Sequence, residues 1–488
     1  MTGDGARCRR TGIPTTDAPL VPSVPRISTP RSAFGARDVI ESALPGAPVF
    51  LPNPRRILWP TAITVVLLAG ALFPLPALRD ALNGLGFDGG KLTYSPAYIW
   101  FSPFFDLLDA MTLLTAPQHY GLAGTALLAW LAVRLRAWVR RTEPVLWWRE
   151  GIVVASVLGM LVGVYAVAAL VPRPMARLVV YDVDAVLVDF HSHTSASHDG
   201  RPGFDVERNR SWHRQAGFHV AYVTDHLSRE GAQSWREIER GLANNPGRAG
   251  DGTVIATGIE ARSGGEHVNI LGASAADLGM LTDGDHLQPG ARLRTGLAPV
   301  IVQTIPATLA NFARVDVDSL SPSIAIEVNA GAPRGLAQNL RDRPLIYRMV
   351  DSLNLAPVAG SDNHGWGRTA AAWTIVHVPG WRSMRPDTLA ARIEDQLRTR
   401  RRWGARTIER RTPQVGPRVS ELFLVVPAVL YELNAALSPP QRLSWIVWTW
   451  LFALFVPLIR YGLLRRRFKR TSGGQRTDTP PGGAEQVA

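Results

Sequence analysis

Four long stretches of the chain carry no charged residue. They cover residues 57–78, 110–133, 151–172 and 443–459. The first three each exceed the roughly 20 residues that a helix needs to cross a ~30 Å hydrocarbon layer. The fourth is shorter, but Arg460 can snorkel to the lipid headgroups and let the helix extend towards Leu464. The pattern predicts four transmembrane helices, three before and one after a long polar region.

Between the third and fourth apolar stretches, the pattern changes to that of a soluble α/β domain. Short segments rich in Val and Ile recur, among them AVLVDF, HVAYVTDH, TVIATGIE, SIAIEVN and APVAGSD. Several are nearly continuous in apolar character, as expected of strands that are buried on both faces. Helical patterns separate some of them, for example at residues 206–216 and 389–398. This alternation of strand and helix predicts a parallel sheet or barrel.

The chain therefore divides into five regions. We predict a disordered basic N-terminal tail over 1–55, a three-helix membrane region over 56–172, a globular domain over 173–415, an interfacial segment with the last span over 419–465, and a disordered basic tail over 466–488. The N-terminal tail is rich in Pro, Ser, Thr, Gly and Arg and has no helical or strand period. The first apolar stretch begins far from the N-terminus, which favours a retained anchor over a cleaved signal peptide.

The placement of arginine sets the expected orientation of the membrane helices. Five arginines lie in the loop of residues 134–150, whereas the loop of residues 79–109 is acidic on balance. Because basic residues are enriched in cytoplasmic loops, we expect an integral membrane protein whose globular domain is extracytoplasmic. The basic stretch RTRRRWGARTIERR at 398–411 conflicts with this orientation. We interpret that stretch as a surface held against anionic lipid, so the lipid bilayer is an expected partner.

The net charge of +13 does not by itself predict a nucleic-acid partner, and we expect none. Only two of the 53 basic residues are lysines, and the heavy use of Arg, Ala and Gly is typical of a base-composition bias. Nucleic-acid binding would also need a basic face with interleaved aromatic residues. The single cysteine, Cys8, excludes an intrachain disulfide framework and a thiolate-rich zinc site.

Ten of the eleven histidines lie between His191 and His377. Histidines and acidic residues follow four of the predicted strands, at His191, His193, Asp225, His226, Glu260, Asp362 and His364. In parallel α/β folds, the carboxyl ends of the strands form the edge where active sites are built. Alternate residues of a strand face one side, so His191 and His193 can bind a common ion. A cluster of His, Asp and Glu without Cys fits Zn²⁺, Mn²⁺ or Fe²⁺.

Five motifs in this order resemble those of the PHP-domain (polymerase and histidinol phosphatase) metallohydrolases: DFHSHTSASHDG, VTDH, GIE, HVNILG and GSDNHG. The resemblance covers roughly residues 180–380. It implies an α/β fold, a distorted (β/α)7-type barrel, here flanked by transmembrane α-helices. It also implies a site with two or three divalent metal ions, and hydrolysis, most often of phosphoesters. Matched motif by motif, the implied metal ligands are His191, His193, Asp199, His226, Glu260, His267, Asp362 and His364, with Glu260 bridging two ions.

One motif of the family has no counterpart here. A later strand of the family often carries a histidine followed by proline, where this chain has Gln303 in PVIVQTIPAT. His286 could substitute from a loop. The departure puts a third ion in doubt and leaves a two-metal site plausible.

Further residues near these motifs have two interpretations. Arg368 in GWGR is a candidate ligand for a substrate phosphate, with simple surface placement as the alternative. His198 could replace Asp199 as a ligand, or lie in a solvated turn. We expect Asp225 to orient a ligand histidine. The remaining histidines of this region, His213, His219 and His377, are expected at the surface or at sheet edges.

These features together predict a membrane-anchored metal-dependent hydrolase. The expected reaction is phosphoester hydrolysis by a metal-bound hydroxide, with Glu260 and Asp362 as catalytic carboxylates and Asp362 as a candidate proton shuttle. The expected substrate is a phosphorylated or ester-type small molecule or a component of the cell envelope. Two alternatives remain open: hydrolysis of amides, carbamates or carboxylic esters, and a non-catalytic membrane sensor with a structural metal site.

Overall fold

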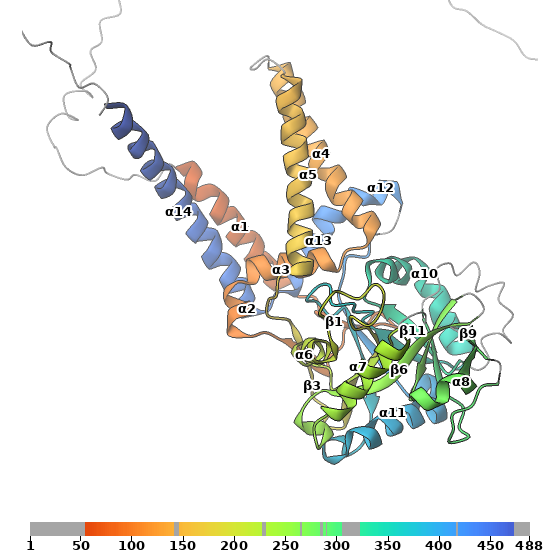
Figure 1. Ribbon diagram of the computed structural model, residues 1–488. Coiled ribbons are helices and arrows are strands. Elements are labelled where there is room, and N and C mark those ends of the chain that lie inside the picture. The colour runs from red at the N-terminus through yellow and green to blue at the C-terminus, as the bar shows by residue number, and fades with distance from the viewer. Residues whose placement is uncertain are drawn as a thin grey trace, which may run out of the picture. The chain divides into compact units, whose positions relative to one another are not determined.

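A computed structural model describes residues 54–140, 146–226, 231–263, 266–283, 286–288, 290–304, 323–415 and 418–472 (Figure 1). The predicted N-terminal tail, apart from its last two residues, and the end of the C-terminal tail lie outside this part. Within it, one mixed sheet of twelve strands has the order β1-β14-β13-β4-β5-β6-β7-β10-β11-β12, with the short β8 and β9 beside β6.

The bounds of the strands match the apolar segments of the sequence. The strands that form the centre of the sheet are β4 (Ala185–Ser192), β5 (Val220–Val223), β6 (Val254–Ser263), β7 (Glu266–Leu271), β10 (Val300–Gln303), β11 (Ala325–Ala330) and β12 (Ala356–Gly360). On the other side of β4 follow β13 (Ala372–His377), β14 (Arg406–Arg410) and β1 (Leu78–Asp80), and β8 (Thr282–Asp283) and β9 (His286–Leu287) are short. Every residue of β4, β5, β11 and β12 is buried, as their apolar sequences predict.

The sheet is mixed, where the sequence predicts a parallel one. β4, β5 and β6 are parallel, and so are β10, β11 and β12, but β7 runs antiparallel to both β6 and β10. Only two residues separate the end of β6 from the start of β7. A connection that short joins antiparallel strands, because a parallel pair needs a long crossover.

The sheet curls until its last strand meets β4. Ser192 at the end of β4 forms a parallel bridge with Asn363, three residues after β12. Two backbone hydrogen bonds support this closure: Asp362 N–H donates to His191 O (2.8 Å), and His193 N–H donates to Asn363 O (3.0 Å). The carboxyl ends of β4 and β12, which carry the first and last metal motifs, are thereby side by side.

Helices cover the outside of the curled sheet. They are α6 (Val206–Ala216), α7 (Gly231–Ala243), α10 (Pro333–Ser352) and α11 (Pro386–Arg400), with a single turn at α8 (Leu278–Leu281). The predicted helix at 206–216 is confirmed. It begins where the Asp205 side chain accepts a hydrogen bond from Arg208 N–H, and it ends at Gly217, whose φ of 95° is a left-handed conformation that favours glycine.

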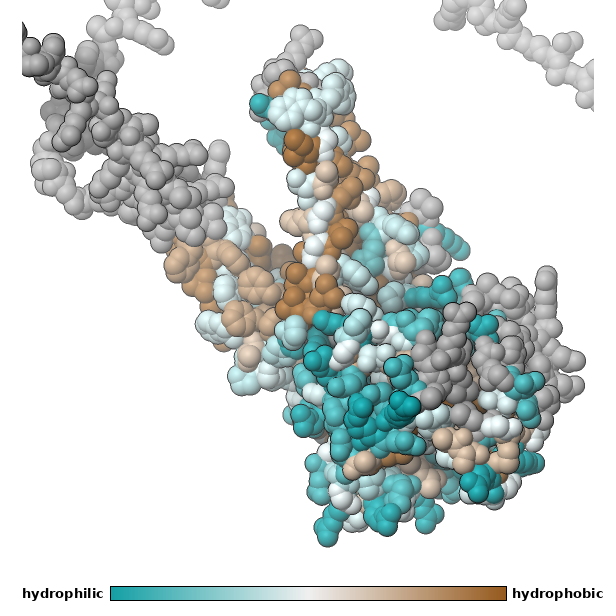
Figure 2. Space-filling view, in the orientation of Figure 1, coloured by the Kyte–Doolittle hydropathy of each residue, from teal (hydrophilic) through white to brown (hydrophobic). Residues whose placement is uncertain are grey.

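Two helices are long and apolar enough to cross a membrane: α4 (Ala116–Val139) and α5 (Trp147–Leu170). Most of their large apolar side chains are exposed, and Figure 2 shows the hydrophobic surface that they form. α1 (Pro54–Leu72) and α14 (Pro439–Ser472) form a second helix pair. The described parts of α1 and α14 are not both long enough and apolar enough to count as membrane-spanning helices. Membrane spans are thus supported for two of the four predicted stretches.

Two of the predicted spans have different limits in the structure. The first ends at Leu72, before Pro74 and Pro76, and its last predicted residue, Leu78, begins β1 of the sheet. The second is divided into α3 (Ser102–Thr112) and α4. The division occurs at Thr115 and Gln118, which form a reciprocal capping box that starts a new helix.

Several segments predicted as membrane region instead pack on the globular domain. β1 pairs with β14 in the main sheet, and β2 (Gly90–Thr93) pairs with β3 (Arg177–Val180) in a separate sheet. The predicted interfacial segment forms α12 (Val419–Leu422) and α13 (Val425–Ala436), and α13 contacts α1, α3 and α4. The globular domain therefore uses residues on both sides of the predicted limits 173–415.

A buried polar cluster joins α3 to this domain. Asp109 of α3 pairs with Arg173 (2.8 Å) and Arg410 (2.9 Å) and accepts a hydrogen bond from the Thr369 hydroxyl (2.9 Å). Tyr98 of α2 (Pro96–Trp100) donates towards Asp106 and Asp109 at 3.0 Å each. Breaking such a buried pair leaves an uncompensated charge, so this cluster fixes α3 against the sheet.

Most arginines of the basic stretch at 398–411 form ion pairs. Arg398 pairs with Glu394, Arg402 with Asp351, Arg406 with Asp80 and Arg410 with Asp109. Part of the stretch is β14, which is paired on both sides in the sheet. The expectation that this stretch forms a basic surface for lipid is therefore not supported by the contacts of these four arginines.

Candidate metal centre

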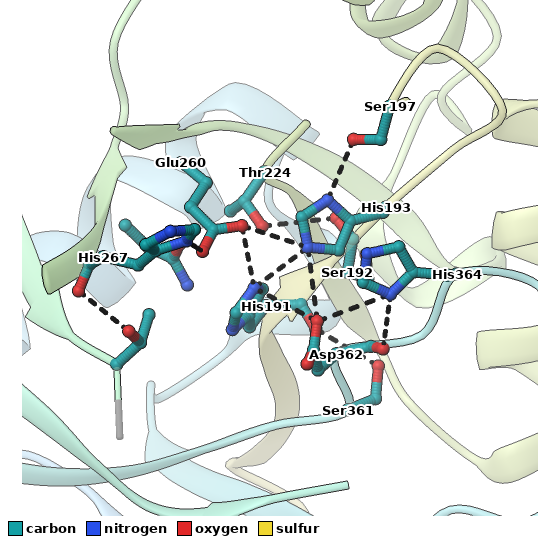
Figure 3. Close-up of polar contacts among 12 residues, drawn as sticks. His191, Ser192, His193, Ser197, Thr224, Glu260, His267, Ser361, Asp362 and His364 are labelled. Atoms are coloured by element: carbon teal, nitrogen blue, oxygen red, sulfur yellow. Dashed lines mark hydrogen bonds and ion pairs between the residues drawn. The ribbon is translucent and has the colours of Figure 1, made fainter. Parts of the chain in front are cut away.

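Seven of the eight predicted metal ligands line one cavity of about 330 Å³, and the eighth, His193, is buried beside them and contacts His191, Glu260 and Asp362. His191 belongs to β4, Glu260 to β6 and His267 to β7, whereas His193, Asp199, His226, Asp362 and His364 lie in the connections after β4, β5 and β12. Strand pairing brings their backbones together, since His226 forms a bridge with Glu260 at the end of β5. Figure 3 shows the side chains of His191, His193, Glu260, His267, Asp362 and His364 converging at the carboxyl end of the curled sheet.

Four donor groups form the centre of this cluster. His191 Nε2 and His193 Nε2 are 3.0 Å apart, and Glu260 Oε2 lies 3.3 Å from each of them. Asp362 Oδ1 lies 3.5 Å from His191 Nε2 and 3.4 Å from His193 Nε2. Two ligands that are each about 2.1 Å from one ion lie about 3 to 3.5 Å apart, so these spacings fit a divalent cation.

The other candidates extend the cluster on both sides. Glu260 also contacts His226 Nδ1 through Oε2 (3.3 Å) and His267 Nδ1 through Oε1 (2.5 Å). Asp199 Oδ2 lies 3.2 Å from His364 Nε2 and 3.8 Å from His226 Nε2. Because both oxygens of Glu260 face histidine nitrogens, this carboxylate is placed to bridge two ions.

The chemistry of the donors fits a bound metal better than a hydrogen-bonded core. Two imidazole nitrogens that face each other at 3.0 Å can share one proton in a hydrogen bond, but they also have the spacing of two ligands of one cation. His364 Nε2 is buried and makes no hydrogen bond of acceptable geometry within the described residues. Buried polar atoms are normally satisfied, and a cation would satisfy these.

Burial and neighbouring charges shift the pKa values of these groups. Burial, with His364 nearby, lowers the pKa of His193 to about 4, which keeps this imidazole neutral and able to ligate. Burial alone would lower the pKa of His191, but Glu327, Asp362 and Glu260 outweigh it and raise the pKa. Burial would raise the pKa of Glu260, but the adjacent histidines hold it well below the usual range. The site thus combines ionised carboxylate with imidazole.

Glu327 of β11 is a site residue that the sequence motifs do not identify. Its Oε1 lies 2.7 Å from His191 Nδ1, the ring nitrogen that faces away from the cluster. A carboxylate in this position fixes the orientation and the tautomer of a ligand histidine. Gly360 makes this contact possible, because a Cβ at residue 360 would overlap the Glu327 carboxylate and His191.

Asp189 and Asp225 hold the backbone that carries the ligands. Asp189 Oδ1 accepts hydrogen bonds from the backbone N–H groups of His191 (3.1 Å) and Ser361 (2.9 Å), and so links the first and last motifs. Asp225 accepts from Thr194 N–H and Oγ (2.6 Å each) and from Ser197 Oγ (3.1 Å). Asp225 Oδ1 is 3.9 Å from His193 Nδ1, so Asp225 supports this ligand mainly through the loop.

His213 does not lie at the surface or at a sheet edge, where the sequence predicts it. It is fully buried on α6, and its Nε2 contacts Asp189 Oδ2 at 2.7 Å. The physical reason is helical period: the buried residues of α6 are Val206, Asn209, Trp212, His213 and Ala216, which form one face. His213 therefore supports the aspartate that joins the two motifs.

The remaining candidates differ in their relation to the cluster. Arg368 does not line the metal cavity and instead lines a second cavity near the end of α5. His198 is exposed and 3.9 Å from Asp199, and its donor atom lies with those of Asp199 and His226 in a group that could hold an ion, so it stays an alternative ligand to Asp199. Gln303 donates to His267 O (3.1 Å). The proposed substitution by His286 concerns a side chain outside the described part of the chain.

Comparisons with known proteins find distant structural likeness only. No protein-family model matches the chain, and no curated protein matches its sequence. PsfC from Pseudomonas syringae PB-5123 is 19% identical over 51% of this chain and 98% of its own, with a TM-score of 0.32. A lesion-specific endonuclease from Pyrococcus furiosus is 13% identical over 44% of this chain and 56% of its own, with a TM-score of 0.30. An amidohydrolase from Chromobacterium violaceum, solved with sulfate and no metal, is 15% identical over 41% and 98%, with a TM-score of 0.25.

Likenesses this distant carry no argument about activity, so the class of the protein rests on its own fold and site. The chain is a mixed α/β protein with a curled sheet, two helices able to cross a membrane, and histidine–carboxylate clusters able to hold metal at the sheet's carboxyl end.

Proposed function

We propose that this chain is a membrane-anchored, metal-dependent hydrolase of phosphoesters with a PHP-type site. The observation that carries the proposal is the convergence of eight histidine and carboxylate side chains from five chain segments, seven of which line one open cavity while His193 is buried behind it. A purely structural metal would need a closed set of four ligands, whereas this cluster has a surplus of donors and opens to solvent. A non-catalytic sensor with a structural metal site is the second candidate function, and the open cluster makes it the less favoured one.

The residues of the cavity have distinct roles in this proposal. His191, His193 and Asp362 would hold one ion, and His226 and His267 would hold a second across Glu260. Bound divalent cations lower the pKa of a coordinated water and polarise the phosphoryl oxygen. Asp362 is a quarter exposed at the cavity and is placed to accept the proton of an attacking water at its carboxylate. Glu327, Asp189 and His213 keep the ligands oriented.

A direct test uses the full chain purified in detergent. We expect hydrolysis of generic phosphomonoesters or diesters that requires Mn²⁺, Zn²⁺ or Fe²⁺, that stops on chelation, and that is lost in His191→Ala. Amide, carbamate and carboxylic ester substrates run in parallel distinguish the alternative chemistries. Metal-bound protein without turnover on any of these substrates would favour the sensor instead.

Arg334 supports a phosphorylated substrate. Arg334 lies at the start of α10 and lines the metal cavity. Its side chain has no ion-pair partner among the described residues. An arginine fork matches a phosphate, and the N-terminus of the helix adds partial positive charge. An amide or ester substrate would not require this cation.

Arg334→Gln is expected to raise KM for a phosphomonoester about tenfold to hundredfold with little change in kcat, because the lost contact binds substrate and not the reacting water. Arg334→Lys should recover part of the loss. Arg348→Gln changes an exposed arginine of the same helix and serves as the matched control. If the native chain, Arg334→Gln, Arg334→Lys and Arg348→Gln had equal KM values, Arg334 would not contact the substrate.

The membrane part of the proposal rests on α4 and α5. The two helices are joined at the end far from the sheet, and this end carries Arg136, Arg140 and Arg149. By the bias of basic residues towards the cytoplasm, the metal domain would lie outside the cytoplasm. Protease digestion of intact cells tests this orientation, and we expect the metal domain to be cleaved. A metal domain that is cleaved only after lysis would instead lie in the cytoplasm.

A further inference from the structure

A second cavity, of about 710 Å³, lies where α5 meets the metal domain. It is lined by Thr93, Tyr94, Ser95, Pro172, Arg173, Pro174, Met175, Arg177, Gln215 and Arg368. Three of these residues are arginines, and no acidic residue is among them. The cavity is separate from the metal cavity, with which it shares no lining residue.

Two of the three arginines have no counter-charge. The side chains of Arg177 and Arg368 make no hydrogen bond or ion pair among the described residues, whereas the side chain of Arg173 is paired with Asp109. Burial and the nearby Arg201 and Arg173 lower the pKa of Arg368. Like charges that gather around a cavity without acidic partners are unfavourable alone, and an anion would offset them.

The position of the cavity indicates the source of this anion. Pro172 and Arg173 lie two and three residues beyond the end of α5, where a spanning helix would leave the hydrocarbon. Gly367, next to Arg368, donates its N–H to Ala169 O in the last turn of α5 (2.8 Å). Its φ of 84° is left-handed, which suits glycine. The loop that carries Arg368 therefore touches the end of the helix directly.

Aromatic side chains of the kind found at membrane interfaces lie close to the cavity along the chain. Ser95, which lines the cavity, caps the start of α2, and α2 ends at Trp100, which is 54% exposed. Trp100 contacts the ring of Trp448 on α14, which also contacts the rings of Phe101, Phe104 and Phe452. Tryptophan and other aromatic side chains gather at the membrane–water interface. If α5 crosses the membrane, the cavity would lie at the depth of the lipid headgroups.

We propose that the cavity around Arg177 and Arg368 binds the phosphate of an anionic phospholipid headgroup. This inference rests on the proposed membrane anchoring and not on the proposed hydrolysis. Arginine forks hold phosphate through paired hydrogen bonds, and the cavity is wide enough for a headgroup. A bound lipid would also lie beside the loop that carries His364, the last of the metal motifs.

Native mass spectrometry of the full chain in mild detergent tests this site. Phosphatidylglycerol and phosphatidylcholine of the same acyl chains are titrated separately. We expect one phosphatidylglycerol molecule to be retained in preference to phosphatidylcholine, and Arg177→Gln/Arg368→Gln to weaken its retention by about tenfold for each arginine. The control Arg236→Gln/Arg392→Gln removes the same charge from exposed arginines of α7 and α11 and should retain the lipid.

Three results would overturn the assignment. They are equal retention of phosphatidylglycerol by the two double variants, equal retention of the two lipids by the native chain, and displacement of the lipid by an equal concentration of inorganic phosphate, which would identify a site for a soluble anion. If the double variant does not fold, Arg177→Gln alone changes an exposed residue and should weaken retention about tenfold. Extraction of the chain from membranes by alkaline carbonate would instead contradict the anchoring.

Discussion

Glu260→Gln is expected to remove most of the bound metal and to lower phosphoesterase turnover by at least about a thousandfold. Glu260 is the one carboxylate in the described cluster that contacts four imidazoles, those of His191, His193, His226 and His267. Glutamine keeps the volume of the side chain but not the charge that offsets two cations. The measurements are metal content by mass spectrometry and turnover of a phosphomonoester at saturating metal.

The matched control for this variant is Glu239→Gln, which changes an exposed carboxylate of α7. It should bind metal and turn over substrate as the native chain does. Thermal unfolding of both variants separates loss of the site from loss of the fold. Full metal content and full turnover in Glu260→Gln would show that this carboxylate does not bridge ions.

Glu327→Gln is expected to weaken metal binding about tenfold to hundredfold, with turnover recovered when metal is in large excess. Glu327 acts through His191, because it contacts Nδ1 at 2.7 Å while Nε2 faces the cluster. The amide can still accept a hydrogen bond, but without the negative charge it makes the imidazole a weaker ligand. A metal titration followed by activity at each concentration separates affinity from turnover.

Glu394→Gln provides a second buried carboxylate for comparison. Glu394 lies on α11, contacts Arg398 and Tyr222, and does not line the metal cavity. Its replacement can lower stability, but it should leave the dissociation constant for the metal unchanged. The same metal affinity in Glu327→Gln and the native chain would mean that Glu327 does not tune His191.

The sequence was sufficient to group the candidate ligands that the structure brings together, because their signals are local. His191 and His193 alternate at the end of a buried strand, and Glu260 and Asp362 also follow apolar runs. Strand ends of parallel neighbours meet at one edge, so residues far apart in the chain could be grouped without knowing the full topology. The antiparallel β7 did not disturb this grouping, because it returns directly from β6.

The residues that support the ligands were harder to predict because their role depends on packing between elements. Glu327 stands within the apolar strand SIAIEVN, and a lone carboxylate inside a buried strand is a signal that could have identified it. The burial of His213 follows from the helical period of α6. The division of the second apolar run could have been detected from the Thr115–Gln118 capping box, since threonine followed three residues later by glutamine starts a helix.

The pairing of β1 with β14 has a consequence for work with the isolated domain. Leu78, Arg79 and Asp80 precede α4 and α5, the two helices able to cross a membrane, yet they complete the outer edge of the main sheet. A fragment that starts after α5 would present the backbone N–H and C=O groups of β14 to solvent and to other copies. Unprotected edges of this kind favour intermolecular strand pairing. A soluble version of this domain therefore needs residues 78–80 reconnected to it, for example by a short linker that replaces the intervening helices.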